Sequence, residues 1–278
     1  MTIEQMIQQA LSEGSHVPRR DVEDLLAHLL GMSWSELLVG KDKEVSEAAL
    51  SDWSHSWSRL KQGEPLAYIT GSKEFYGIDF YVNPSVLIPR PETELIIEEF
   101  LDRNDLSNPK ILDLGCGSGC IGLTVAKKDP PSEVYLIDVS PAAILVAEKN
   151  KLRLGIENAT LIEGEVGSPQ FSISSLKGQV DFVLANPPYI ENGDKRVSQS
   201  VDQYEPHLAL YADNKGMNWI HKWLTWSYDY MKPEAIGIFE FGEGQAKDVC
   251  AAVKKENYRL LEVIKDYSDI ERLVVFQK

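Results

Sequence analysis

The spacing of apolar residues along the chain changes from one region to the next. Over residues 1–63, apolar positions recur every three or four residues, which is typical of amphipathic helices. Thr2-x-x-Gln5 and Ser33-x-x-Glu36 match the capping box that begins a helix. One apolar stripe is expected to lie inside a small helical bundle, and it consists of Leu50, Trp53, Trp57 and Leu60.

Residues 64–90 show a different pattern, in which apolar and aromatic residues alternate with polar ones. Alternation at every second residue favours β-strands, and Gly71 and Gly77 divide the region into short pieces. We therefore expect a β-hairpin linker here rather than a helix. Pro91 is suited to the first turn of the helix that follows.

From residue 91 to residue 278, short apolar runs alternate with helical patterns. Seven runs have the length and composition of buried strands: KILDLG, EVYLIDV, ATLIEGE, VDFVLANPPY, IGIFEFG, LLEVIKDY and ERLVVFQ. Such strands interleaved with helices indicate a parallel sheet covered on both faces, and the last two runs indicate an antiparallel hairpin at its edge. The sequence thus predicts an α/β fold. A seven-stranded, mostly parallel, Rossmann-like domain at 91–278 would follow a helical domain at 1–63 and a linker at 64–90.

The net charge of −15 limits the partners of the chain. An acidic chain lacks the basic footprint needed to bind along nucleic acid, so a small molecule or a protein with a basic surface is favoured. No apolar run reaches the ~18 residues of a membrane span, and the first residues lack the apolar centre of a signal peptide. Cys116, Cys120 and Cys250 form no disulfide framework, and no histidine cluster accompanies them. We expect a cytoplasmic protein without a metal site.

A glycine-rich turn follows the first predicted strand of the sheet. In ILDLGCGSGCIGL, Asp113 leads into three alternate glycines, which let the chain turn sharply and let a ligand approach the backbone. At the end of the next strand, Asp138 can hold both ribose hydroxyls of a nucleoside. Dinucleotides and S-adenosylmethionine both use such turns, and the acid before the glycines suits the cationic, phosphate-free S-adenosylmethionine better. The residues expected at the cofactor from this part of the chain are Asp113, Gly115, Cys116, Gly117, Ser118, Gly119 and Asp138.

The fourth strand of the sheet ends in Asn186-Pro187-Pro188-Tyr189. Two consecutive prolines make a stiff, non-helical platform. On it, the Asn186 side-chain oxygen and the Pro187 carbonyl can accept both hydrogens of a planar NH2 group, in bonds that strengthen as the nitrogen becomes positive during methyl transfer. Tyr189 offers a ring face to the substrate or to the cationic methyl. We expect all four residues to bind substrate, Asn186, Pro187 and Tyr189 to be catalytic, and Asn186 also to contact the cofactor.

These motifs, with others, resemble those of the protein-(glutamine-N5) methyltransferases of class 1 peptide chain release factors, the PrmC or HemK family. The blocks EPLAYITGSKEFYG, LIPRPETE, ILDLGCGSGCIGL, NPPYI, YEPHLAL, FEFGEGQ and DYSDIERLVV follow the family's order. The resemblance implies methyl transfer from S-adenosylmethionine to the side-chain amide of the glutamine in a Gly-Gly-Gln loop. It also implies a class I S-adenosylmethionine-dependent methyltransferase fold and a helical N-terminal domain that helps to grip the release factor.

The chain departs from the family pattern after the third strand of the sheet. An Asp followed by a large aromatic residue usually frames the adenine there, whereas IEGEVGS places Glu165 and Val166 at these positions. The longer acid can still accept from the adenine amino group, but Val166 cannot stack on the ring. The resemblance therefore implies somewhat weaker cofactor binding.

Two other functions would use the same residues. An adenine-N6 methyltransferase acting on DNA or RNA shares the Asn-Pro-Pro-Tyr motif, but it needs a basic groove that this chain lacks. A non-catalytic adaptor that binds cofactor and release factor would have no need of the intact motif. The sequence assigns no role to four charged residues inside the family blocks: Arg90, Glu92, Glu240 and Glu243.

Overall fold

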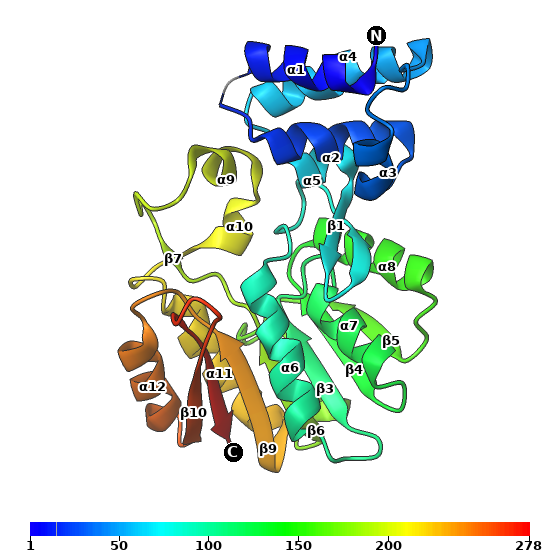
Figure 1. Ribbon diagram of the computed structural model, residues 1–278. Helices are drawn as coiled ribbons and strands as arrows, with labels where there is room; N and C mark the ends of the chain where they lie inside the picture. Colours follow the sequence, from blue (N-terminus) through cyan, green and yellow to red (C-terminus); the bar gives the residue numbers. More distant parts are fainter. Residues whose placement is uncertain (15) are drawn as a thin grey trace. The chain divides into compact units, whose positions relative to one another are not determined.

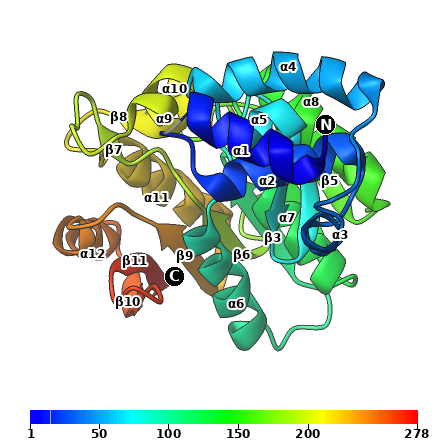
Figure 2. The same ribbon diagram turned by 45° about the horizontal axis from the view of Figure 1, so that its top comes forward.

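The structure is a computed structural model of the 278-residue chain. It describes residues 1–14 and 16–278, without the side chains of residues 47 and 48. The chain forms two compact units (Figure 1, Figure 2). The smaller, N-terminal unit contains Met1–Ser72 and Val197–Tyr204, and the larger unit contains Lys73–Arg196 and Glu205–Lys278.

The N-terminal unit is helical, as the apolar spacing predicted. Its helices are α1 (Ile3–Glu13), α2 (Arg19–Leu30), α3 (Trp34–Val39), α4 (Glu47–Lys61), α5 (Leu66–Thr70) and α9 (Gln199–Tyr204). Both predicted capping boxes form, at Thr2 and at Ser33. The indole rings of Trp53 and Trp57 stack with their centroids 5.4 Å apart, and both are buried in the core of the unit.

Helix α9 belongs to this unit although it follows the Asn-Pro-Pro-Tyr motif in sequence. Two hydrogen bonds connect its side chains to the backbone after α4: Ser200 Oγ donates to the Gly63 carbonyl at 2.6 Å, and Tyr204 Oη donates to the Gln62 carbonyl at 3.2 Å. The sequence pattern did not predict this association, because six residues carry too little apolar periodicity to assign a partner.

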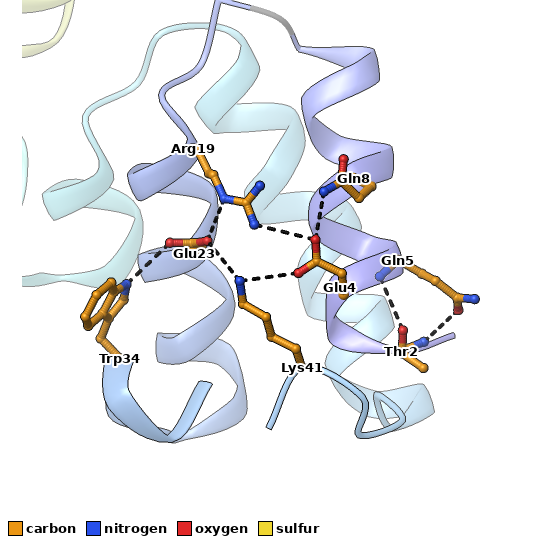
Figure 3. Close-up of polar contacts among 8 residues, drawn as sticks. All are labelled: Thr2, Glu4, Gln5, Gln8, Arg19, Glu23, Trp34 and Lys41. Atoms are coloured by element: carbon orange, nitrogen blue, oxygen red, sulfur yellow. Dashed lines mark hydrogen bonds and ion pairs between the residues drawn. The ribbon is translucent and has the colours of Figure 1, made fainter. Parts of the chain in front are cut away.

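A buried carboxylate connects several segments of the N-terminal unit (Figure 3). Glu23 on α2 accepts hydrogen bonds from Arg19 Nε at 2.8 Å and from Trp34 Nε1 at 3.4 Å. Lys41 Nζ lies 3.9 Å from Glu23 Oε1 and 3.4 Å from Glu4 Oε2 on α1. Because a buried carboxylate is costly without partners, this cluster favours one arrangement of α1 against α2.

The expectation that residues 64–90 contain no helix was wrong. Leu66–Thr70 form helix α5, with Pro65 at its N-cap and Gly71 ending it in the left-handed conformation at φ +67°. A helix of five residues is too short for its period to stand out from an alternating pattern. The predicted hairpin begins immediately afterwards, as β1 (Ser72–Phe75) and β2 (Ile78–Tyr81).

The larger unit contains the predicted seven-stranded sheet. Its strands are β3 (Lys110–Leu114), β4 (Glu133–Asp138), β5 (Ala159–Glu163), β6 (Val180–Ala185), β9 (Met231–Glu240), β10 (Arg259–Lys265) and β11 (Glu271–Gln277). The spatial order is β10-β11-β9-β6-β3-β4-β5. Five neighbouring strands pair in parallel, whereas β11 pairs antiparallel with both β9 and β10, so the predicted α/β class and edge hairpin are confirmed.

Helices cover both faces of this sheet (Figure 1). They are α6 (Glu94–Arg103), which follows the 3-10 turn η1 (Pro91–Thr93), then α7 (Cys120–Lys128), α8 (Pro141–Leu154), α11 (Asn218–Tyr230) and α12 (Ala246–Lys255). The short helix α10 (His207–Leu210) also belongs to this unit. A 3-10 turn, η2 (Ser174–Leu176), and a two-stranded pair, β7 (Ile190–Glu191) with β8 (Tyr211–Ala212), complete the unit. No helix within the described ranges is long and apolar enough to cross a membrane.

Successive residues of each strand enter different cores, as the two-residue period requires. Ile111 packs with residues of α6 and α7, whereas Leu112 packs with residues of α11 and α12. The strand order reverses between β3 and β6, which lie side by side in parallel register. Their carboxyl ends, which carry the glycine turn and the Asn-Pro-Pro-Tyr motif, therefore meet at the position where open α/β sheets bind ligands.

Candidate active site

A pocket of about 770 Å³, including the part open to solvent, lies at the carboxyl ends of the central strands. Gly115 and Gly117 line it after β3, Asp138 after β4, and Asn186 and Pro188 after β6. The segment before α6, the segment around α10, and two tryptophans of α11 complete its wall. A recess at the carboxyl ends of parallel strands is where α/β folds commonly bind small molecules.

The glycine turn adopts a backbone conformation that other residues rarely reach. Gly115, Gly117 and Gly119 have φ values of +69°, +53° and +80°. The amides of Gly115 and Cys116 both donate to the Ile137 carbonyl, at 2.8 and 3.0 Å, which ties the turn to the end of β4. The turn therefore exposes bare backbone to the pocket in a fixed position.

The side chain of Asp113 helps to hold this turn through a hydrogen bond to the helix that follows. Its carboxyl is fully buried, and Oδ2 accepts from the Gly122 amide at 2.8 Å, in the first turn of α7. Burial raises the pKa of Asp113 to about 7, and the Gly122 hydrogen bond opposes the rise. Within the described residues, Oδ1 has no hydrogen-bond partner. An acid thus occupies the N-terminus of α7, where a pyrophosphate would otherwise bind.

Asp138 presents a carboxyl group to the pocket. One oxygen accepts from the Gly117 amide at 2.8 Å and the other from the Ser140 amide at 2.9 Å. Burial raises the pKa of Asp138, and these backbone hydrogen bonds oppose the rise. Each carboxylate oxygen can accept a second hydrogen bond, so the group has capacity for two neighbouring hydroxyls.

Asn150 is a residue of this site that the sequence did not single out. It is fully buried on α8, where its Oδ1 accepts from the Tyr81 amide at 2.7 Å. Its Nδ2 donates to the carbonyls of Tyr81 and Ser118, each at 2.9 Å. The side chain thereby joins β2 to the glycine turn. A buried amide in the middle of an otherwise ordinary helix was the only available signal.

The cysteines of the turn are suited to packing rather than to metal binding. Burial raises the pKa of Cys116 well above its usual value and that of Cys120 to about 12, so both thiols stay protonated at neutral pH. Metal-bound cysteines are thiolates. In the part of the chain that the structure describes, no group of three or more His, Cys, Asp or Glu residues could hold a metal ion.

The Asn-Pro-Pro-Tyr motif is held by a buried polar network. Asn186 Nδ2 donates to Thr93 Oγ1 at 3.0 Å, and Thr93 Oγ1 donates to Glu240 Oε2 at 2.7 Å. The other oxygen of Glu240 accepts from the Tyr189 hydroxyl at 3.0 Å. Thr93 and Glu240 are almost completely inaccessible to solvent. The end of β9 thus fixes both polar residues of the motif.

Gln245 and Gly216 fix the backbone of the same motif. Gln245 Nε2 donates to the carbonyls of Tyr189 and Lys215, each at 2.9 Å, while its Oε1 accepts from the Gly242 amide at 2.8 Å. A Cβ at Gly216 would lie 1.9 Å from the Tyr189 carbonyl oxygen, so only glycine allows this approach. The sequence had given no interpretation of the loop that contains Gly216.

Arg90 connects two of the family blocks. Its Nη2 donates to Glu205 Oε1 at 2.7 Å, and the Ile88 amide donates to Glu205 Oε2 at 3.2 Å. Glu205 is buried, so loss of these partners would be costly to stability. The segments that flank this pair, before α6 and at α10, both line the pocket.

Two tryptophans line the same pocket as the unusual Glu165 and Val166. Trp219 and Trp223, one turn apart on α11, have ring centroids 6.4 Å apart and both line the pocket. Val166 and Trp223 belong to the same core cluster, and Lys222 Nζ lies 3.9 Å from Glu165 Oε1. Aromatic rings of α11 therefore line the same pocket as Val166.

Two family models and several curated proteins match this chain. The PrmC N-terminal domain model matches residues 3–71, and the Methyltransferase small domain model matches residues 91–204. A release factor glutamine methyltransferase from Salmonella typhimurium is 33% identical over 93% of this chain and 92% of its own length. One from Escherichia coli is 31% identical over 99% of this chain and 98% of its own length. The chain belongs to the release factor glutamine methyltransferase family.

A solved structure supports the fold of this family member. The crystal structure of a methyltransferase from Pyrococcus furiosus matches 81% of this chain and 98% of that protein, with a TM-score of 0.54 and 18% identity. At this identity the likeness concerns the fold. It agrees with the seven-stranded, mostly parallel sheet predicted from the strand pattern.

The predicted site residues of this family member form two groups. Those that line the pocket are Gly115, Gly117, Asp138, Glu165, Val166, Asn186 and Pro188. Those outside its lining are Asp113, Cys116, Ser118, Gly119, Pro187 and Tyr189. Three residues of the second group support the first: Asp113 accepts from the Gly122 amide of α7, the Ser118 carbonyl accepts from Asn150, and the Tyr189 hydroxyl donates to Glu240.

Proposed function

We propose that this enzyme transfers a methyl group from S-adenosylmethionine to the side-chain amide nitrogen of the glutamine in a release factor's Gly-Gly-Gln loop. One observation carries this proposal beyond family membership. Asn186 lines the pocket while its NH2 group donates to Thr93, so the carbonyl oxygen is the group left for a substrate. A carbonyl oxygen at this place accepts a hydrogen bond from an NH2 nucleophile.

The pocket residues fit S-adenosylmethionine better than a dinucleotide. Asp138 has two oxygens with spare acceptor capacity for the ribose hydroxyls, and Gly115 and Gly117 leave the backbone open to the methionine end. Asp113 at the start of α7 would repel a pyrophosphate. We assign stacking on the adenine ring to Trp219 of α11. Its indole would take the place of the aromatic residue that is missing at Val166, and would so offset the weaker cofactor binding expected from that position.

S-adenosylmethionine, when bound, supplies an electrophilic methyl group on a positively charged sulfur. The protein's part is to aim the glutamine nitrogen at that carbon. The Asn186 oxygen and the Pro187 carbonyl accept the two N–H hydrogens, and these bonds strengthen as positive charge develops on the nitrogen. The N–C bond forms as the S–C bond breaks, sulfur keeps the electron pair, and the nitrogen then releases one proton to solvent. No general base is required before the methyl group is transferred.

The N-terminal unit is assigned to binding of the release factor in the cytoplasm. This assignment rests on the family model matched by residues 3–71 and on the net charge of −15, which suits a protein partner with a basic surface. A nucleic-acid substrate would need the opposite charge.

Methyl-labelled S-adenosylmethionine tests this function. The enzyme is incubated with an intact release factor, with the same factor carrying alanine for the Gly-Gly-Gln glutamine, and with an adenine-containing oligonucleotide. We expect label only in the intact factor. Label in the oligonucleotide alone would favour adenine methylation. If neither the release factor nor the oligonucleotide were labelled although the protein bound S-adenosylhomocysteine, a non-catalytic adaptor would be favoured.

A further inference from the structure

Glu240 and Thr93 are buried polar residues that the methyl-transfer chemistry does not use directly. Thr93 lies in the 3-10 turn before α6, and Glu240 ends β9. Together they form a continuous chain of hydrogen bonds from Asn186 to Tyr189. Their burial excludes water as an alternative partner for Thr93 and Glu240. The direction of each hydrogen bond is therefore set by the donors and acceptors of the linked residues alone.

We infer that Thr93 and Glu240 are positioning residues that fix which face of the Asn186 amide meets the substrate, and that protonation of Glu240 reverses this orientation. The inference rests on the proposed function, because it concerns how Asn186 receives the glutamine NH2 group. It assigns Thr93 and Glu240 no contact with the reacting atoms.

The direction of the chain follows from counting protons. Thr93 has one hydroxyl proton, and an ionised Glu240 can only accept, so that proton goes to Glu240 Oε2. Thr93 Oγ1 must then accept from Asn186, which places the Asn186 NH2 group on the Thr93 side and leaves its oxygen for the substrate.

If Glu240 is protonated on Oε2, the hydrogen bonds between Glu240 and Thr93 and between Thr93 and Asn186 reverse their direction. The carboxylic acid donates to Thr93 Oγ1, and the Thr93 proton then points to Asn186. An Asn186 NH2 group cannot accept it, so the amide turns and presents its oxygen to Thr93. The NH2 group now faces the substrate NH2, and two donors cannot form a hydrogen bond. The substrate then meets the NH2 group of Asn186 in place of its carbonyl oxygen.

The environment of Glu240 makes this proton exchange accessible near neutral pH. The pKa of Glu240 is raised to about 7, mainly by burial and in part by the nearby acid Glu92. The hydrogen bonds from Thr93 and Tyr189, and the charge of Arg272, act in the opposite direction. The charge of Glu240 also acts on the thiol of Cys120, which stays protonated. Tyr189 also stays protonated, because burial and Glu240 raise its pKa well above the usual value.

The active form is therefore the one with Glu240 ionised. Since the group is an acid with its pKa raised to about 7, the active fraction grows as the pH rises through neutrality and falls below it. The change should appear in kcat, because Asn186 acts on the bound glutamine, and not in cofactor affinity. This separation distinguishes a positioning role from a general loss of structure.

Four variants test the inference at saturating peptide and S-adenosylmethionine. Thr93→Val keeps the branched shape but removes the hydroxyl, and Thr93→Ser restores it. Glu240→Gln removes the titratable group, and Glu243→Gln, at an exposed acid three residues away, is the control for the same change of charge. We expect Thr93→Val to lower kcat by about 10²-fold while Thr93→Ser stays within a few-fold of the wild type.

The pH profile gives the sharper result. We expect the wild type and Glu243→Gln to lose kcat below about pH 7, and Glu240→Gln to show no such acidic limb. An acidic limb that persists unchanged in Glu240→Gln would overturn the inference, as would equal kcat values for Thr93→Val and Thr93→Ser. S-adenosylhomocysteine affinity should be the same in all four variants.

A readout without substrate separates this inference from the proposed function. The side-chain NH2 signals of Asn186 in a 15N–1H NMR spectrum should shift with pH in the wild type and stay constant in Glu240→Gln. If the wild type methylated no glutamine but these signals behaved as expected, the proposed function would fail and the network would stand. Signals that ignore pH in the wild type would overturn the network itself.

Discussion

Replacement of Gly115 by alanine should cost much more stability than the same replacement at Gly117. Both glycines have positive φ values, of +69° and +53°, where a residue with a Cβ pays about 1–2 kcal/mol. Their surroundings differ. A Cβ at Gly115 would lie 2.5 Å from Cη2 of the buried Trp223 ring, which is too close for two carbon atoms. A Cβ at Gly117 would meet no heavy atom within 4 Å.

The difference can be estimated from these contacts. Overpacking against a buried ring destabilises the folded state by about a further 1–3 kcal/mol. Alanine also lowers the conformational entropy of the unfolded chain, which stabilises either variant by about 0.4–1 kcal/mol. We therefore expect Gly115→Ala to lower the free energy of unfolding by about 2–4 kcal/mol and Gly117→Ala by about 1 kcal/mol.

Urea unfolding of the ligand-free enzyme measures both values. Gly115→Ala combined with Trp223→Phe is the matched control, because the smaller ring removes the atoms that a new Cβ would meet. In that background the alanine at position 115 should cost no more than the alanine at position 117. Equal losses for the two single variants would refute the packing of Trp223 against the glycine turn.

Four further predictions concern catalysis, binding and stability. Asn186→Ala should lower turnover by about 10²–10³-fold with little change in S-adenosylhomocysteine affinity by calorimetry, and an unchanged rate would remove Asn186 from the chemistry. Trp219→Ala should weaken S-adenosylhomocysteine binding by about tenfold, and unaltered binding would exclude it from the adenine site. Arg90→Ala should lower the free energy of unfolding by about 3 kcal/mol because it leaves Glu205 buried without its cation, and a second change, Glu205→Gln, should recover part of this loss. Raised salt should increase KM for the release factor, whereas a constant KM would argue against charge complementarity.

The sequence predicted the sheet well because its strands are buried on both faces and read as continuous apolar runs. The positions of Asp138 and Asn186 followed directly, since each comes at the end of such a run and the ends of parallel strands meet at one edge. Short elements were less predictable. Helix α5 is too brief to show a helical period, and nothing in the pattern of α9 indicated the unit to which it belongs.

The supporting residues of the site were beyond prediction for a different reason. Thr93 and Glu240 are separated by 147 residues and meet only because η1 and the end of β9 converge beneath the Asn-Pro-Pro-Tyr motif. Asn150 and Trp219 similarly act across elements, on the glycine turn and on the pocket wall. A sequence shows which residue types are present, but hydrogen bonds between distant segments depend on the packing of the whole unit.

Fragment mass spectrometry of a release factor after incubation with the enzyme and S-adenosylmethionine tests the central claim most directly. The account predicts one added methyl group, located on the side chain of the Gly-Gly-Gln glutamine, and far less of this product after incubation with Asn186→Ala under the same conditions and time. A methyl group on any other residue, or one formed equally well by Asn186→Ala, would contradict it.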